Sequence, residues 1–168
     1  MKKISCILCL FISSLAQSQT DSLPVNIAFS RITGDWDGYF EFVVNDEGKT
    51  MTMSAKCTSS WDGKKWKFDV VYDEGEGVVS GGKGEALAST DGQIINYNND
   101  LWTVSQVNAR GDSTSIVLEI TGKEKRKTVS TRHVILVTST TFFITEYRKE
   151  EGQADFVFSM KHLFRRRK

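Results

Sequence analysis

GDWDGYFEFVV, residues 34–44, decides the fold class of this 168-residue chain, because apolar and polar side chains alternate along it. One face carries Trp36, Phe40, Phe42 and Val44. The opposite face carries Asp35, Asp37, Tyr39 and Glu41. Successive side chains of a β-strand point to opposite faces, so this alternation predicts a strand with one buried face.

The same alternation recurs along the chain between turn signals. Well-marked strands are predicted within Thr50–Trp61, Trp66–Tyr72, Ser115–Thr121 and Phe156–Phe164. Weaker strands are predicted within Lys83–Ser89, Gln93–Tyr97, Leu101–Ala109, Thr128–Val137 and Thr141–Arg148. Turns are predicted between these runs, among them Asp62-Gly63, Gly81-Gly82, Asn98-Asn99-Asp100 and Glu151-Gly152. This spacing indicates about ten strands, preceded by a short helix within Pro24–Ile32.

Consecutive hairpins without a long crossover form an antiparallel meander. Such a meander leaves two exposed edges unless its last strand pairs with its first. We therefore expect an all-β fold, an antiparallel up-and-down barrel of about 8–10 strands. A barrel of eight strands is nearly filled by its own side chains or holds one small ligand, and about ten strands leave more room.

Residues 1–18 have the features of a secretory signal peptide. Met1-Lys2-Lys3 is positively charged, Ile4–Leu15 is mostly apolar, and small residues precede Gln17 and Gln19. The apolar run is shorter than the about 20 residues that a membrane span requires, and the sequence shows no later transmembrane span. Residues 19–168 are expected to form a single domain, exported to the periplasm or the extracellular space.

Charge and cysteine content exclude two further classes. Lys and Arg number 22 against 21 Asp and Glu, a net charge of +1, which excludes a nucleic-acid binder that relies on bulk positive charge. Once the leader is removed, Cys57 is the remaining cysteine, so an internal disulfide is excluded. Its place on the apolar face of its strand predicts a buried, inert thiol.

The apolar strand faces supply the candidate ligand-binding residues. They are Trp36, Phe40, Phe42, Trp66, Phe68, Phe158, Met160 and His162. Such side chains line most ligand pockets, together with a few polar groups that orient the ligand, and they equally form the packed core of a barrel. We expect His133 to lie at the surface. Close-spaced metal-ligand pairs and catalytic motifs are absent from the sequence, so we predict no cofactor, no metal and no enzymatic activity.

Gly34-Asp35-Trp36, at the start of the first strand, resembles the G-x-W signature of lipocalins and the wider calycin group. Extended to Tyr39, it is similar to the G-x-W-x-G opening of bacterial secreted lipocalin-like domains of unknown function and of nitrobindin-like haem proteins. The resemblance implies that Trp36 closes the base of a lipocalin-like barrel and that an arginine from Arg165–Arg167 covers it. Phe40-Glu41-Phe42 departs from the nitrobindin pattern, which has further glycines and a Tyr-Pro-Thr turn.

Three functional hypotheses follow. The first is a secreted lipocalin-like protein that binds a small apolar or amphipathic ligand inside the barrel. The alternative is a filled barrel that acts as a surface interaction or envelope-associated module. The second alternative is a haem-binding barrel that uses His162, whose place near the end of the barrel resembles the nitrobindin arrangement. The sequence leaves the ligand and the oligomeric state open.

Overall fold

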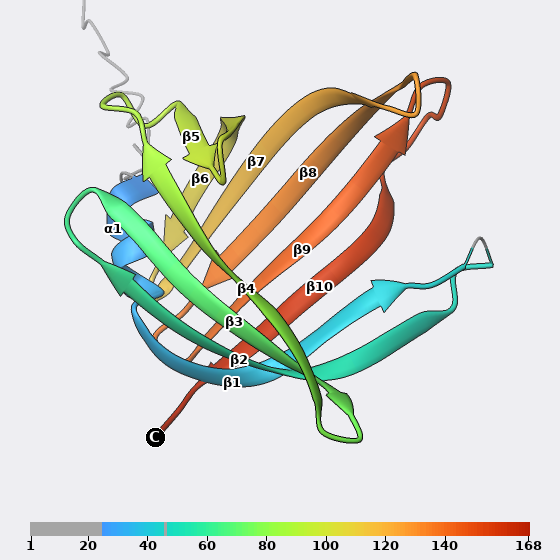
Figure 1. Ribbon diagram of the computed structural model, residues 1–168. Helices are drawn as coiled ribbons and strands as arrows, with labels where there is room; N and C mark the ends of the chain where they lie inside the picture. The colour runs from blue at the N-terminus through green and yellow to red at the C-terminus, as the bar shows by residue number, and fades with distance from the viewer. Residues whose placement is uncertain (1–24, 46) are drawn as a thin grey trace, which may run out of the picture.

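A computed structural model describes residues 25–45 and 47–168. The predicted leader, residues 1–18, lies outside the described residues. One short helix precedes ten strands (Figure 1). The elements are α1 (Val25–Arg31), β1 (Gly34–Val43), β2 (Thr50–Trp61), β3 (Lys65–Gly75), β4 (Val78–Ala88), β5 (Ile94–Tyr97), β6 (Asp100–Arg110), β7 (Ser113–Glu124), β8 (Lys127–Val137), β9 (Thr141–Glu150) and β10 (Val157–Arg166). In the described part of the chain, no helix is long and apolar enough to cross a membrane.

The ten strands form a closed antiparallel barrel, which confirms the predicted fold class. Each strand pairs with its neighbours in the chain, and β10 closes the barrel against β1 through pairs such as Trp36↔Arg166 and Phe40↔His162. Closure leaves neither the first nor the last strand as a free edge, which is the physical advantage of this topology.

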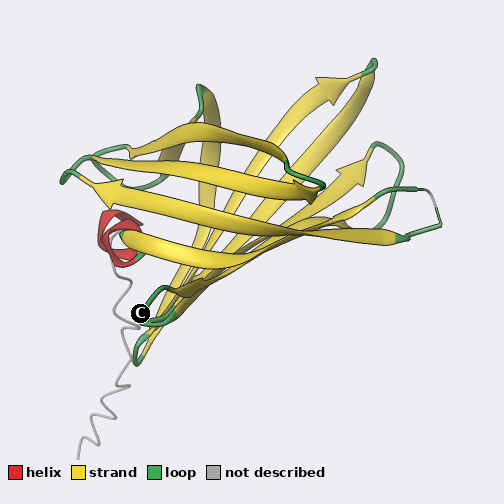
Figure 2. Cartoon of the chain, turned by 60° about the horizontal axis from the view of Figure 1, so that its bottom comes forward, coloured by secondary structure: helices red, strands yellow, loops and turns green. Residues whose placement is uncertain are grey.

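Helix α1 lies at one end of the barrel, which we call the closed end (Figure 2), and its buried residues belong to the hydrophobic core. Ala28, Phe29 and Ile32 are buried there, and Phe29 stacks on Trp66 with ring centroids 5.3 Å apart. The opposite end, the open end, is formed by the β1–β2, β3–β4, β7–β8 and β9–β10 connections, which splay apart in Figure 1. The short helix therefore plugs one end of the barrel and leaves the other accessible.

Trp36 closes the base of the barrel, as the resemblance implied. Its ring is fully buried, and its Nε1–H donates to the carbonyl of Ile32 at 2.7 Å. The covering arginine is Arg166, whose guanidinium lies 4.2 Å from the centroid of the Trp36 ring. This guanidinium also donates to the carbonyls of Arg31, Thr33 and Ser139 at 2.9–3.0 Å. Arg166 thus ties β10 to the helix end and to the β8–β9 turn.

Steric constraints explain why both positions of the opening motif are glycine. Gly34 adopts a φ of 126°, where L side chains are rarely found, and a Cβ there would lie 2.7 Å from Nη1 of Arg166. Gly38 has ordinary backbone angles, but a Cβ would lie 1.9 Å from the carbonyl oxygen of Leu163. The motif therefore permits the β1 backbone to approach β10 closely where the barrel closes.

One predicted turn was wrong. Gly81-Gly82 lies inside β4, and the chain reverses instead around Glu76 and Gly77, which both have positive φ. A Cβ at Gly81 would lie 2.2 Å from the carbonyl oxygen of Val70, and a Cβ at Gly84 would lie 2.1 Å from the Phe68 ring. Glycine at these positions serves close packing against β3 rather than a change of chain direction.

The wall of the barrel is incomplete toward the open end. Strand β5 has 4 residues and pairs with β4 only at Ala86–Ala88. In the described part of the chain, the half of β4 nearer the open end therefore has a strand partner only on its β3 side. Gly82 in this half faces the interior, because it is paired with the inward-facing Val70. A Cβ at Gly82 would meet nothing within 4 Å, so the interior beside it is open.

Candidate functional site

An interior cavity of about 80 Å³ lies between the closed end and the open end. Its wall is mostly aromatic and aliphatic, with a few polar groups. The lining residues are Cys57, Trp66, Phe68, Val70, Tyr72, Tyr97, His133, Phe142, Ile144, Glu146, Met160, His162 and Phe164. Four of the residues selected from the sequence are among them: Trp66, Phe68, Met160 and His162.

Three more of the selected residues lie next to this cavity. Trp36 packs on its closed-end side, edge-on to Phe142 with ring centroids 4.8 Å apart. Phe40 stacks on the His162 imidazole, with centroids 4.5 Å apart, and Phe42 stacks on Phe40 at 5.0 Å. The two phenylalanines continue the aromatic lining from His162 along β1 toward the open end.

Phe158 lies on the outer face of the barrel, so the alternation assumed for the last strand fails there. A β-bulge between Phe158 and Met160 shifts the register, and Phe158 lies opposite Tyr147, whose ring centroid is 6.4 Å away. Tyr147 is in turn opposite Arg132, which forms an ion pair with Glu119 on the outer face. The extra residue, Ser159, points inward to Glu146.

A hydrogen bond crosses the interior from β3 to β10. The hydroxyl of Tyr72 and Nε2 of His162 are 2.7 Å apart, and β2 and β1 separate their two strands. Burial of His162, together with the nearby His133, lowers the pKa of its imidazole to about 4. Burial likewise raises the pKa of the Tyr72 phenol above its ordinary value. Both side chains are therefore uncharged at neutral pH.

A second polar group joins β8, β9 and β10. Nε2 of His133 lies 2.9 Å from Oε2 of Glu146, and the Ser159 hydroxyl donates to Oε1 of Glu146 at 3.0 Å. His133 is buried, so its predicted place at the surface was wrong; its ring stacks on Trp102 at 4.3 Å. Burial alternates along β8, with Val129, His133, Ile135 and Val137 buried, but the sequence does not show this, because Val134 and Leu136 on the opposite face are apolar too.

The electrostatics of Glu146 show how the site holds a charge. Burial alone would raise the pKa of this carboxyl. The hydrogen bonds from His133 and Ser159, with the nearby charges of His133 and Arg148, outweigh burial and hold its pKa below the ordinary value. Glu146 is therefore an ionised carboxylate in a mostly apolar cavity.

Cys57 is a buried free thiol on the inner face of β2, as predicted. Its burial, reinforced by the charges of Asp69 and Asp35, raises the pKa of the thiol to about 12. Because the thiolate is the reactive species, Cys57 acts here as a small apolar lining residue.

Haem does not fit this arrangement. Nε2 of His162, the atom that would bind iron, is hydrogen-bonded to Tyr72, and Phe40 covers one face of the imidazole. The second functional alternative, haem binding through His162, receives no support from the geometry.

The polar groups also lack the order of a catalytic triad. Glu146 stands between His133 and Ser159, whereas acyl-transfer triads place the imidazole between the hydroxyl and the carboxylate. Among the residues that the structure describes, none form a group of three or more His, Cys, Asp or Glu side chains able to hold a metal ion.

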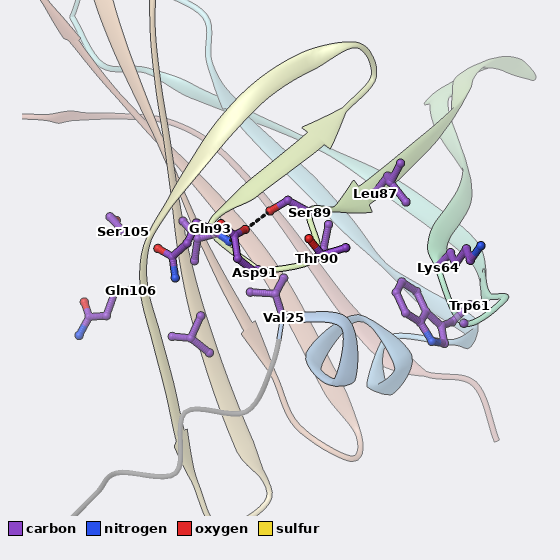
Figure 3. Close-up of a pocket in the computed structure, with 15 residues that line it drawn as sticks. Val25, Trp61, Lys64, Leu87, Ser89, Thr90, Asp91, Gln93, Ser105 and Gln106 are labelled. Carbon is purple, nitrogen blue, oxygen red and sulfur yellow. Dashed lines mark hydrogen bonds between the residues drawn. The ribbon is translucent and has the colours of Figure 1, made fainter.

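A larger hollow of about 750 Å³ lies outside the barrel at the closed end (Figure 3). It is bordered by Val25, Trp61 and the loop between β4 and β5. The polar groups of this loop bond to one another: Ser89 donates to Asp91, and Asp91 accepts from the Gln93 amide. Since these groups are already satisfied and the hollow is open to solvent, the smaller interior cavity is the better candidate site.

Comparison with known proteins bears on the fold alone. No family model matches the sequence, and no curated protein matches it significantly. The crystal structure of Rv2717c from M. tuberculosis is similar, with a TM-score of 0.57 at 13% identity over 88% of this chain and 100% of that one. The S-type phycobiliprotein lyase CPES from Guillardia theta gives a TM-score of 0.52 at 11% identity over 87% and 93% of the two chains.

The fold is a lipocalin-like barrel. At these identities the likeness extends to the arrangement of strands and to nothing finer. The ligand and the role of each cavity residue must therefore be argued from this chain's own side chains.

Proposed function

We propose that this protein binds a small apolar or amphipathic molecule inside the barrel. The observation that supports this proposal best is the cavity itself, whose mainly apolar wall is interrupted by two polar groups, Tyr72–His162 and His133–Glu146–Ser159. Convergent polar groups in an apolar pocket are the usual means of orienting a ligand. A barrel of this kind can hold one small ligand.

The open end provides the route of entry. Four exposed apolar residues lie beside its hairpin connections: Val44, Met51, Val78 and Val157. From there Phe42 and Phe40 lead down β1 to His162 at the cavity. An apolar molecule thus meets apolar surface from the open end to the cavity. Its body can extend from the cavity toward the open end, beyond the enclosed volume.

Binding is tested with the full chain and a neutral fluorescent dye, N-phenylnaphthylamine. We expect saturable dye uptake and a co-purified small molecule in native mass spectrometry. A protein that takes up no dye and no small molecule would instead be the filled barrel of the first alternative, acting through its outer surface.

Filling the interior from β4 is expected to block uptake. Gly82→Trp places a large ring in open space on the inner face beside Val70, so dye affinity should fall at least about tenfold, or about 1.4 kcal/mol. Lys83→Trp is the matched control, because Lys83 lies on the outer face opposite Asp69. Equal dye affinity in the two variants, both folded by circular dichroism, would contradict an interior site.

We also propose that the chain is exported. This rests on the pattern of residues 1–18. Expression in a bacterial host should yield a processed protein outside the cytoplasm whose intact mass corresponds to a start at Gln17 or Gln19. An unprocessed chain in the cytoplasmic fraction would contradict the proposal and leave the binding site unaffected.

A further inference from the structure

An ionised carboxylate inside an apolar cavity indicates what kind of ligand the cavity accepts. The side chain of Glu146 is 12% exposed, and it shares the cavity wall with aromatic rings such as Trp66, Phe68 and Tyr97. Burying a charge is costly unless partners compensate it. A carboxylate kept at this position needs a structural or a functional explanation.

The hydrogen bonds to Glu146 fix its position and leave part of it available. His133 bonds to Oε2 and Ser159 to Oε1. An ionised carboxylate offers roughly four acceptor positions, so these two bonds leave room for further donors. Stacking on Trp102 holds the His133 ring, and the β-bulge turns Ser159 inward. The carboxylate, which lies on β9, is therefore oriented by residues of β8 and β10.

Apart from His133, which is bonded to Oε2 of Glu146, the cavity contains little positive charge to compensate this carboxylate. Among its described lining residues, none is Lys or Arg. Arg148 is the next inward-facing residue after Glu146 on β9, toward the open end, and it forms an ion pair with Glu124. The His162 imidazole is uncharged at neutral pH, as its low pKa requires. Aromatic faces, which also attract cations, make up much of the remaining wall.

We propose that the ligand is a small protonated amine with an aromatic or aliphatic body, bound with its ammonium group against Glu146 and its body among Trp66, Phe68 and Tyr97. This inference rests on the proposed interior binding function and makes it more specific. A carboxylate of the same size is disfavoured, because its charge would face that of Glu146 in a poorly solvated space.

Phenethylamine and phenylacetate form the test pair, since they share a ring and differ in the sign of their charge. Each is titrated at pH 7 against the full chain loaded with N-phenylnaphthylamine. We expect phenethylamine to displace the dye at a concentration at least about tenfold below that of phenylacetate, the effect of one charge-assisted hydrogen bond. In Glu146→Gln the two concentrations should become similar.

Glu119→Gln is the matched control, because Glu119 is an ion-paired glutamate on the outer face; it should keep the amine preference. Phenylacetate binding as well as or better than phenethylamine would overturn the inference while leaving interior binding intact, as would an amine preference that persists in Glu146→Gln. If Glu146→Gln does not fold, the preference of the unaltered chain decides. Absence of dye uptake would be a failure of the proposed function itself.

Discussion

Gly38→Ala is expected to lower the free energy of unfolding by at least about 3 kcal/mol. The new Cβ would lie 1.9 Å from the carbonyl oxygen of Leu163, 2.8 Å from its carbonyl carbon and 2.9 Å from Cα of Phe164. All three atoms belong to the backbone of β10, so no side-chain rotation relieves the clash. The β1 and β10 backbones must move apart at the seam that closes the barrel.

Gly122→Ala is the control for this prediction. Gly122 also lies in a strand with ordinary backbone angles, but a Cβ there would meet nothing within 4 Å. We expect this variant to unfold at the same urea concentration as the parent or at a slightly higher one, since alanine restricts the unfolded chain. Urea denaturation followed by tryptophan fluorescence measures both. Equal stability of the two variants would show that the close approach of β1 and β10 at Gly38 does not limit the free energy of unfolding.

Most of the fold was predictable because the buried face of most strands is largely apolar. In β2, β3 and β7 the alternation in the sequence matches the alternation in burial, and in β1 it does so at Asp35, Trp36 and Asp37. The prediction failed where one position departed from the regular pattern. Gly81-Gly82 was predicted to be a turn but lies inside β4, where Gly81 admits close packing against β3, and the bulge before Met160 placed Phe158 outside.

The candidate site was less predictable, for a related reason. Trp66, Phe68, Met160 and His162 were found because apolar strand faces predict the interior. Glu146 and His133 were missed as site residues, since a polar residue in an alternating strand is normally predicted to face outward. Only the register between β8, β9 and β10 brings His133, Glu146 and Ser159 together. Such cross-strand constellations have no local signature in the sequence.

His162 is expected to make the protein lose stability on acidification. Its pKa is about 4 in the folded protein, against about 6.5 for an unperturbed histidine. Between these values the unfolded chain binds a proton that the folded protein does not, so stability falls as the pH is lowered from about 6.5 to about 4. A shift of this size corresponds to about 3 kcal/mol. Above about pH 6.5 the effect vanishes, because His162 is then uncharged in both states.

His162→Gln isolates this effect, because glutamine can still bond to the Tyr72 hydroxyl but does not titrate. The comparison is one of slopes: between pH 7 and pH 4 the parent should lose about 3 kcal/mol more unfolding free energy than the variant. His133 and Glu146, the other titratable groups that act on His162, are present in both proteins and largely cancel. An NMR titration gives an independent value, with a midpoint near pH 4 expected for His162. A midpoint near the ordinary histidine value and parallel stability curves would mean that water reaches the imidazole and that burial does not keep it uncharged in the folded protein.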